Sequence, residues 1–499
     1  MSAFIDARTI ETGTSQSPDL AIIGGGPAGI ALAMALADTQ FKVLLLESGG
    51  MNFDPAVQKM YAGQETGYEP LDADRLRYLG GGTNHWGGWC RPMDASDFMI
   101  RDWVPSSGWP FGRETLEPYF PRAQSLVEAG AWAYDRGGDA LASSHAPMLP
   151  LGKGGIYTTW FQFSKMQDDV LPTQFGHRYA DDLRGQANLT VWLNANVTGI
   201  RLAANGASVD HLDVATLNGK SFTVKPRYTV LACGGIENAR LLLVSNDVMQ
   251  TGIGNGADLV GRYFADNPIP RDVATMVVFG GKLASYYSDR MDMGHGARLK
   301  AAFAPTDDYR GIARIGGSLT TVEQPVDLDD VGKAAVATTA AALGVDAGSA
   351  RAYSLGCGLE LIPDPDRRVT LTPEKDALGL ARLKMVNTIS DEDFARYRRT
   401  LEELGRQLLA SKSGMLRINC TTREEWMKNM DWGHHHLGTT RMHDDPRRGV
   451  VDSNSRVHGL PNLYVAGSSV FPSYGASNPT MNLIALTLRL ADHIKAVMA

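Results

Sequence analysis

The 499-residue chain has only four cysteines, no long apolar run and no long basic run, and each scarcity argues against a class of protein. The cysteines are scattered without CxxC spacing, which disfavours a zinc ribbon, a redox dithiol and a disulfide scaffold. No stretch of about 18 apolar residues could span a bilayer. The net charge is −7 and no basic cluster occurs, so we expect neither nucleic acid nor a membrane as a partner.

The first twenty residues also lack the basic and apolar regions of a signal peptide, and we therefore expect a cytoplasmic protein. Residues 1–17 are polar and rich in Ser and Thr, which predicts a loose tail. Hydrophobic residues make up 43% of the chain, which excludes a disordered protein and is enough for a large core.

A nucleotide-binding unit is indicated close to the amino terminus. An apolar run ends at Gly24, the pattern Gly24-x-Gly26-x-x-Gly29 opens a helical stretch, and a second apolar run ends in Glu47. In such a unit the glycines allow a tight turn and let a pyrophosphate approach the helix N-terminus. Glu47 is placed to accept hydrogen bonds from a ribose diol. The pattern predicts dinucleotide binding rather than a plain glycine-rich turn, and it does not separate FAD from NAD.

A second glycine-rich segment, residues 80–88, contains Thr83, Asn84, His85 and Trp86. Its glycines allow backbone N–H groups to lie against a ring or a phosphate. A purely structural turn would rarely include both His and Trp. We therefore favour a cofactor contact over a structural turn.

The rest of the chain indicates two kinds of sheet. Apolar runs at residues 228–232 and 462–466 end in small residues and predict further strands of the nucleotide-binding sheet. Between residues 270 and 430, alternating runs predict antiparallel strands, and residues 391–409 predict an amphipathic helix. The Ala-rich segment 331–350 is interpreted as a mobile insertion or an ordinary surface helix. The predicted fold class is α/β, a Rossmann-like domain built from discontinuous segments plus an α+β substrate domain with an antiparallel sheet.

Three consecutive histidines, His434 to His436, raise the question of a metal site. Consecutive residues of a strand point to alternate faces, so His434 and His436 would share one face and His435 the other. Three such neighbours make a poor tetrahedral site, and we expect no metal. We interpret the segment as one functional histidine between two structural ones.

Asn478, in the sequence Ala-Ser-Asn-Pro-Thr, follows a predicted strand and would stand at a helix N-terminus beside the cofactor. Together the motifs resemble the glucose–methanol–choline (GMC) family of FAD-dependent oxidoreductases. The resemblance covers the first 110 residues, the strand near 228–243 and the last 70 residues. It implies that FAD is the cofactor and that His435, in His-x-x-Gly-Thr, and Asn478 are catalytic.

The motifs look most like those of bacterial sugar and glycoside oxidases and pyranose oxidase, where a Thr-His-Trp element can carry a histidine bonded covalently to the flavin. Here Asn84 is inserted between Thr83 and His85, which disfavours a covalent bond to His85 without excluding it. Another family stretch often ends in His-Pro, and this chain has Asn267 there. The resemblance places cofactor contacts at Gly24, Gly26, Gly29, Glu47, Gly81, Thr83, Asn84, His85, Trp86, Val197, Gly234, Gly467, Ser468, Asn478, Pro479 and Thr480.

These assignments divide the chain into two domains after the tail. The FAD-binding domain is expected to comprise residues 18–110, 185–265 and 431–499. The substrate-binding domain is expected to comprise residues 111–184 and 266–430.

The resemblance implies oxidation of a sugar or glycoside hydroxyl, a secondary one at C2 or C3, to the ketone by hydride transfer to flavin N5. His435 would act as the base, Asn478 would hydrogen-bond the same oxygen, and oxygen, a quinone or a protein electron acceptor would reoxidise the flavin. An imidazole pKa of about 6.5 predicts that kcat/KM rises with pH near 6–7. Oxidation of a primary or non-sugar alcohol and a lyase reaction on the same fold are the alternatives.

Substrate contacts are the least defined part of the sequence. Sugar recognition combines aromatic rings with hydrogen-bonding groups, and four such residues lie in segments that could line a pocket. They are Trp160, Gln162, Tyr353 and Glu360. Trp160 and Gln162 would share one face if residues 157–163 form a strand.

Overall fold

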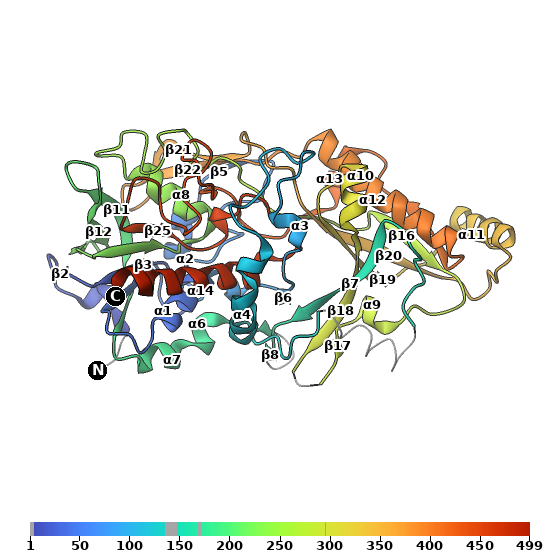
Figure 1. The fold of residues 1–499 in the computed structure, drawn as a ribbon, viewed down its shortest axis with the longest axis horizontal. Coiled ribbons are helices and arrows are strands. Elements are labelled where there is room, and N and C mark those ends of the chain that lie inside the picture. The colour runs from blue at the N-terminus through green and yellow to red at the C-terminus, as the bar shows by residue number, and fades with distance from the viewer. Residues whose placement is uncertain (1–3, 135–146, 168–170, 295) are drawn as a thin grey trace.

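The computed structural model describes residues 4–134, 147–167, 171–294 and 296–499. Figure 1 shows two regions side by side, one built on a parallel sheet and the other on an antiparallel sheet. The carboxyl terminus lies in the parallel-sheet region, and helix α11 lies at the opposite end of the molecule (Figure 1). Among the helices of the described part, none is both long and apolar enough to cross a bilayer.

The parallel sheet is assembled from segments that are far apart in the chain. Its order is β1 (Phe4–Asp6), β10 (Leu189–Leu193), β4 (Val43–Leu46), β3 (Leu20–Ile23), β14 (Tyr228–Leu231) and β25 (Leu463–Val465). Every residue of β3 and β4 is buried, as expected of parallel strands that are covered on both faces. The predicted nucleotide-binding sheet is therefore present, with its early, middle and late strands adjacent.

One prediction at the amino terminus is wrong. Residues 1–17 were expected to form a loose tail, but β1 pairs in parallel with β10, and Ala7 is fully buried beside it. A further strand, β2 (Ser15–Gln16), adds to a second sheet with β11 (Asn196–Leu202), β12 (Val209–Ala215) and β13 (Ser221–Val224). The segment is polar because both strands lie at sheet edges, where none of their residues is buried.

Three helices begin at the carboxyl ends of the parallel strands or close to them. They are α1 (Pro27–Ala35), α8 (Gly234–Val244) and α14 (Pro479–Met498). Proline at the first position starts both α1 and α14, where its missing N–H costs nothing. Shorter helices in this region are α2 (Pro55–Gln58), α3 (Ala95–Phe98), α4 (Phe120–Leu126), α6 (Phe175–Arg178) and α7 (Ala180–Gly185).

The antiparallel sheet forms the wall opposite the parallel strands. Its order is β23 (Gly414–Ile418), β16 (Ala274–Val278), β20 (Arg351–Leu359), β19 (Ser318–Pro325), β18 (Arg298–Pro305), β7 (Ile156–Phe163) and β6 (Trp89–Cys90), with β17 (Met291–Asp292) beside β18. The remaining helices of this region are α9 (Ser285–Ser288), α10 (Asp307–Ala313), α11 (Asp330–Leu343), α12 (Asp391–Ala410) and α13 (Arg423–Lys428).

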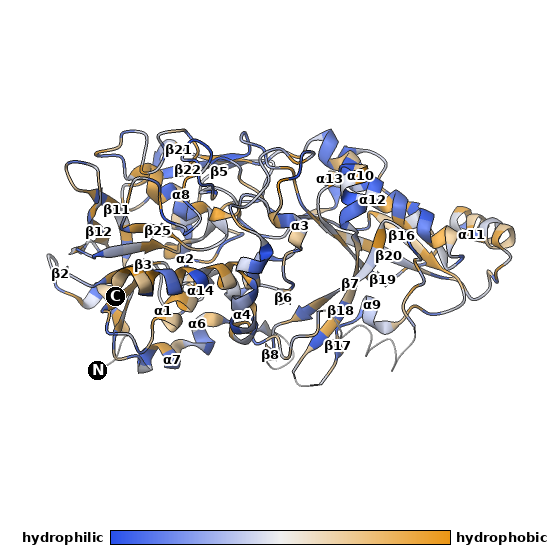
Figure 2. Ribbon diagram, in the orientation of Figure 1, coloured by the Kyte–Doolittle hydropathy of each residue, from blue (hydrophilic) through white to orange (hydrophobic). Residues whose placement is uncertain are grey.

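Helix α12 covers one face of this sheet, and the predicted amphipathic helix is confirmed. Its buried residues Tyr397, Leu401, Leu404 and Leu408 recur at helical spacing and join the apolar cluster of that face. Figure 2 shows many hydrophilic residues along the rest of α12. The Ala-rich segment contributes α11, which buries Val336 and Ala340 against β16 and β20.

Three small sheets complete the described part of the fold. They are β21 (Arg368–Lys375), β22 (Ala381–Val386) and β5 (Gln64–Thr66); β15 (Pro268–Pro270) and β24 (Met430–Trp432); and β8 (Met166–Gln167) and β9 (Leu171–Pro172). The pair β15–β24 places Pro268 opposite Trp432, and an isolated bridge joins Ala265 to Leu437. The three histidines therefore lie on a short loop held directly beside residues 266 and 267.

Candidate active site

A cavity of about 470 Å³ lies where the parallel strands end. Its floor comes from the carboxyl ends of β3, β4 and β14 and the start of α14, and its wall from β7, β19 and β20. In open α/β sheets, ligands bind outside the carboxyl ends of the strands. The cavity is therefore where a dinucleotide is expected.

The glycine-rich turn between β3 and α1 lines this cavity. Gly24 has φ = +106°, and a Cβ there would lie 2.6 Å from the carbonyl oxygen of Ala232. A Cβ on Gly29 would overlap the carbonyl oxygen of Gly24, so this glycine lets the helix pack on the turn. Gly26 differs, because a Cβ there would meet no atom within 4 Å and would extend into open space. The N–H groups that begin α1 are thus accessible to an anion.

Glu47 follows β4 at the edge of the cavity. Its Oε2 accepts a hydrogen bond from the Gly25 N–H at 2.7 Å, and its Oε1 accepts one from the Gly49 N–H at 2.8 Å. Burial raises the pKa of Glu47, and the two backbone donors oppose that change. The carboxylate thus holds the glycine-rich turn in place, in addition to facing the cavity where the ribose contact was predicted.

The second glycine-rich segment forms η3 (Gly81–Asn84) and the loop after it. Gly81, Thr83, His85 and Trp86 line the cavity. Asn84 does not, because its side chain is buried and donates to the Leu79 carbonyl at 3.0 Å. The structure therefore places the inserted asparagine as a brace of the loop rather than a cofactor contact.

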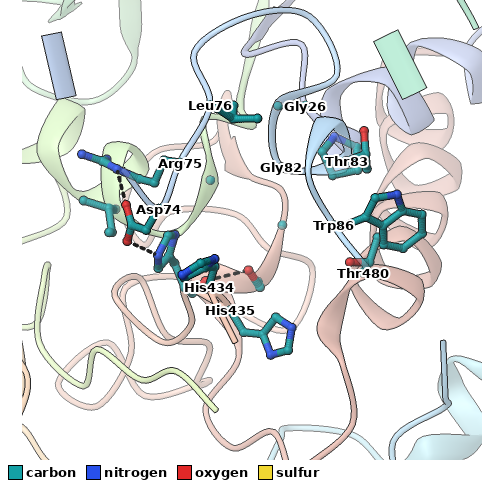
Figure 3. Close-up of a pocket in the computed structure, with 18 of the residues that line it drawn as sticks. Gly26, Asp74, Arg75, Leu76, Gly82, Thr83, Trp86, His434, His435 and Thr480 are labelled. Atoms are coloured by element: carbon teal, nitrogen blue, oxygen red, sulfur yellow. Dashed lines mark hydrogen bonds and ion pairs between the residues drawn. The ribbon is translucent and has the colours of Figure 1, made fainter. Parts of the chain in front are cut away.

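The remaining predicted cofactor residues also line the cavity. These are Val197, Gly234, Gly467, Ser468, Asn478, Pro479 and Thr480. Gly29 is the exception besides Asn84, since it supports the turn from behind. Figure 3 shows Gly26, Gly82, Thr83, Trp86 and Thr480 around one side of the cavity.

A charged cluster that the sequence analysis did not predict lies on the other side of the cavity. Arg75 Nη1 lies 3.0 Å from Glu237 Oε1, and Arg77 donates to Asn196 Oδ1 at 3.0 Å. Burial alone would raise the pKa of Glu237, but the surrounding guanidinium groups hold it at about 2. Arg77 Nε is buried and has no hydrogen-bond partner among the described residues. The alternation Arg75-Leu76-Arg77 before the glycine run was the one available sequence signal.

The three histidines have three different sets of partners. His434 Nε2 lies 2.9 Å from Glu69 Oε2, and His436 Nε2 lies 2.8 Å from Asp74 Oδ2. Both therefore face the segment 69–74, whereas His435 points away from Asp74 (Figure 3). His434 has φ = +55°, so the loop is not a regular strand even though the side chains divide as predicted. No group of three metal-binding side chains occurs within residues 4–134, 147–167, 171–294 and 296–499.

His435 lies between two asparagine side chains, one at each ring nitrogen. Its Nδ1 lies 2.8 Å from Asn267 Oδ1, and its Nε2 lies 3.2 Å from Asn478 Nδ2. The backbone N–H of His435 donates to Asp266 Oδ1 at 2.8 Å. Burial lowers the pKa of His435 to about 3, and the neighbouring His436 and His434 act in the same direction. The ring is therefore neutral throughout the physiological pH range.

His85 lies next to His434 at the cavity lining. Their rings are stacked with centroids 6.0 Å apart, and His85 lines the cavity. Burial lowers the pKa of His85 to about 4, and the adjacent histidines contribute. A neutral His85 ring beside the cofactor site is compatible with a positioning role.

The structure places all four predicted substrate residues outside the cavity. Trp160 packs against Tyr286 in the apolar cluster under α12, and Tyr353 accepts a hydrogen bond from the Leu283 N–H at 3.1 Å. Gln162 is fully buried, and its amide bonds the backbone at Ala129, Ala131 and Ala133. The two residues of β7 do share a face, as predicted, but it is not the cavity face.

Glu360 has a structural partner instead of a ligand. Arg101 binds its two carboxylate oxygens at 2.6 and 2.8 Å, and Arg310 lies 3.4 Å away. Burial alone would raise the pKa of Glu360, but these guanidinium groups hold it at about 2. The carboxylate is therefore neutralised inside the protein and unavailable to a sugar.

The cavity wall is formed by the opposite strand faces. Phe161 from β7 and Leu319 and Thr321 from β19 line it, as do Arg271 and Trp432 near its edge. Arg271 is held by Glu323 at 2.8 Å and by Asp431 at 3.0 Å. On β7 the cavity is lined by Phe161, which lies between the predicted residues Trp160 and Gln162 and points to the opposite face of the strand.

The cavity residues fit a flavin dinucleotide. Gly26 leaves a cradle that any side chain would fill, and the starts of α1, α8 and α14 all border the cavity. Buried Arg77 lines the same space and adds a positive charge beside it. The three helix starts and this cation suit the negative charge of a pyrophosphate.

Comparison with known proteins agrees with this fit. The model of the family described as GMC oxidoreductase matches residues 363–487, and that of pyridine nucleotide-disulphide oxidoreductase matches residues 18–281. Paromamine 6'-oxidase from Streptomyces fradiae is 26% identical over 534 residues, which cover 95% of this chain and 91% of the relative. The fructose dehydrogenase large subunit from Gluconobacter japonicus is 27% identical over 281 residues, covering 55% of this chain and only about half, 48%, of the relative.

A solved structure shows the same fold. Pyridoxine 4-oxidase from Mesorbium loti superposes with a TM-score of 0.57 at 21% identity. The superposition covers 96% of this chain and 99% of that one. Both the parallel and the antiparallel regions therefore have counterparts in a known oxidase.

Proposed function

Because this chain belongs to the GMC oxidoreductases, which are FAD-dependent enzymes that oxidise alcohol groups, we propose that its substrate is a sugar or glycoside. The reaction is oxidation of a hydroxyl group, a secondary one at C2 or C3, to the ketone. Similarity to a fructose dehydrogenase subunit and to a paromamine oxidase supports a sugar as the substrate class. The resemblance of the motifs to pyranose and glycoside oxidases supports the ring position.

The pair formed by His435 and Asn478 carries this proposal. Their polar atoms lie 3.2 Å apart and both residues line the cavity, so one hydroxyl oxygen can contact both. FAD held in this cavity would supply the hydride acceptor, and oxygen or another electron acceptor would reoxidise it. Removal of the hydride from carbon requires that the hydroxyl proton be taken by a base, and neutral His435 is able to accept it at Nε2. Asn478 cannot titrate and orients the substrate oxygen by hydrogen bonding.

Other residues that line the cavity exclude water from His435 and Asn478 and are suited to bind the rest of the substrate. Phe161, Leu319 and Trp432 form an apolar wall that excludes water from the reacting carbon. Thr321 and Arg271 are the polar groups on the same wall and are suited to bind the other hydroxyls of a sugar. Specificity therefore depends on the faces of β7 and β19 that point toward the cavity.

Anaerobic reduction of the bound flavin tests the proposal directly. We expect at least one sugar or glycoside to bleach the flavin absorbance, and NMR of the product to show a ring ketone. A parallel panel of simple primary alcohols is the control for substrate class. If primary alcohols reduce the flavin and no sugar does, the substrate class is wrong. If no alcohol of either panel reduces it, the enzyme is not an alcohol oxidoreductase, and a lyase reaction becomes the better description.

The pH dependence of kcat/KM should differ from that of an enzyme whose catalytic base has an ordinary histidine pKa. Only neutral His435 can accept a proton, and its pKa is lowered to about 3, so the active form is lost only as the pH falls toward 3. The titratable groups beside it are His434 and His436 on its own loop and buried Asp266. We expect kcat/KM to be flat between pH 5 and 8, measured with saturating acceptor. An ascending limb centred at pH 6–7, as the sequence alone predicted, would contradict the buried neutral base.

A further inference from the structure

Asn267 is a buried residue that connects three segments at the active site. It precedes β15, and its side chain amide donates to the Leu359 carbonyl at 2.6 Å and to the Gly475 carbonyl at 3.3 Å. Its Oδ1 lies 2.8 Å from Nδ1 of His435. All hydrogen-bonding atoms of this side chain are therefore used, although it does not belong to the reacting pair.

The two carbonyl groups fix the direction of the Asn267 amide. A carbonyl oxygen only accepts hydrogen bonds, so the NH2 end must face Leu359 and Gly475. Rotating the amide by half a turn would set its oxygen against two carbonyl oxygens in a buried site, at the cost of two unsatisfied acceptors. The oxygen must consequently face His435.

This direction determines which nitrogen of His435 carries the proton. At 2.8 Å from an amide oxygen, Nδ1 must be the donor, because two lone pairs at that distance would repel. A neutral imidazole has one N–H, so Nε2 has none and presents its lone pair to the cavity. Asn478 Nδ2, at 3.2 Å, is able to donate to that lone pair until a substrate hydroxyl replaces it.

The backbone of both residues is fixed by one carboxylate. Asp266 Oδ1 accepts hydrogen bonds from the N–H groups of Asn267, at 2.6 Å, and His435, at 2.8 Å. Tyr68 donates to the other oxygen of Asp266. The distance between Asn267 and His435 is therefore set by the backbone as well as by their side chains.

We infer that Asn267 is a positioning residue that holds His435 in the Nδ1–H tautomer and so keeps Nε2 free to accept the substrate proton. The inference rests on the proposed function only in its last step, since the tautomer is a property of the protein without substrate. A neutral amide also differs from a carboxylate in this position. It orients the ring without stabilising an imidazolium, so the base stays neutral before each turnover.

The tautomer itself is measurable in the FAD-loaded protein without any turnover. Two-bond 15N–1H correlation spectra of the protein labelled with [15N]histidine distinguish the two nitrogens, and His435→Gln identifies the signal. We expect protonated Nδ1 and unprotonated Nε2 from pH 5 to 9. A protonated Nε2, or an average of both tautomers, would overturn the inference.

Two substitutions of Asn267 test its consequences, with surface Asn205→Asp as the matched control. We expect Asn267→Leu to retain FAD, to lower kcat about 100-fold and to change KM less than about threefold, because the tautomer is no longer fixed. We expect Asn267→Asp to move the ascending limb of kcat/KM up by about 2 pH units, since a carboxylate favours the charged ring. A limb that stays at low pH in Asn267→Asp, or wild-type kcat in Asn267→Leu, would contradict the role.

Failure of the proposed function has a different signature from failure of this inference. If His435→Gln retains wild-type turnover while the spectra show the Nδ1–H tautomer, His435 is not the base but Asn267 still fixes its tautomer. If the spectra show the other tautomer, the inference fails whatever the activity. Flavin absorbance of each variant verifies that the site has folded.

Discussion

Replacing His435 with alanine should lower kcat about 1000-fold while the flavin stays bound, because a positioned general base contributes about 10²–10⁴-fold. The ring lines the cavity, and among the described residues its hydrogen bonds go to Asn267 and Asn478, while its backbone N–H is held by Asp266. Its removal therefore deletes the proton acceptor without opening the glycine-rich turn or the charged cluster. Asn478 remains to orient the hydroxyl, so KM should change much less than kcat.

Stopped-flow measurement of flavin reduction separates this effect from slow reoxidation. The first-order rate of bleaching by the best substrate should fall by the same factor as kcat. His177→Ala, an exposed histidine outside the cavity, is the control and should behave like the wild type. A reduction rate of His435→Ala within tenfold of the wild type would exclude the imidazole as the base.

The nucleotide-binding half of the site could be predicted because its signals are local. The strand, turn, helix and acid of the first unit lie within about thirty residues, and Gly24 and Gly29 are required there by close backbone contacts. Helix α14 begins at Pro479, directly after Asn478, for an equally local reason. Each of these features depends on the conformation of its own segment, and the sequence of that segment is sufficient to predict it.

The substrate wall could not be predicted, because period-two alternation gives two faces of a strand but not the one that faces a ligand. Trp160 and Gln162 look suited to a sugar, yet they pack toward α12 and the backbone near Ala131. Their neighbour Phe161 faces the cavity. Which face of β7 lines the cavity and which is packed in the interior depends on the position of α12, some 230 residues later in the chain.

The hydrogen-bond partners of His435 could not be predicted from the sequence for a similar reason. Asn267 and His435 are 168 residues apart, and they meet because β15 pairs with β24 on one side and Ala265 with Leu437 on the other. The structure also replaces the ordinary histidine pKa expected from the sequence with a lowered one, because the degree of burial is a tertiary property. Chemistry-bearing residues could thus be recognised by type, whereas their protonation and orientation required the folded structure.

Alanine at Gly29 and alanine at Gly26 should have opposite effects, although the two glycines belong to one motif. A Cβ on Gly29 would overlap the carbonyl oxygen of Gly24, and this backbone atom cannot move without displacing β3 from α1. We expect Gly29→Ala to lower the free energy of unfolding of the FAD-free protein by about 3 kcal/mol, the upper range for overpacking. FAD content should fall as a consequence.

Gly26→Ala should leave the stability of the FAD-free protein unchanged, because a Cβ there meets no atom within 4 Å and its backbone angles, φ = −78° and ψ = −173°, suit alanine. The added methyl group extends into the cavity at the N-terminus of α1, where the pyrophosphate is expected to approach the backbone. We therefore expect the Kd for FAD to rise about 10- to 100-fold, equivalent to about 1.4–3 kcal/mol.

Urea unfolding of the FAD-free chain and fluorescence titration with FAD separate the two effects. Unchanged FAD affinity in Gly26→Ala would mean that the cofactor does not approach the chain at this turn. An equal loss of FAD-free stability in both variants would mean that Gly26 supports the fold in the same way as Gly29.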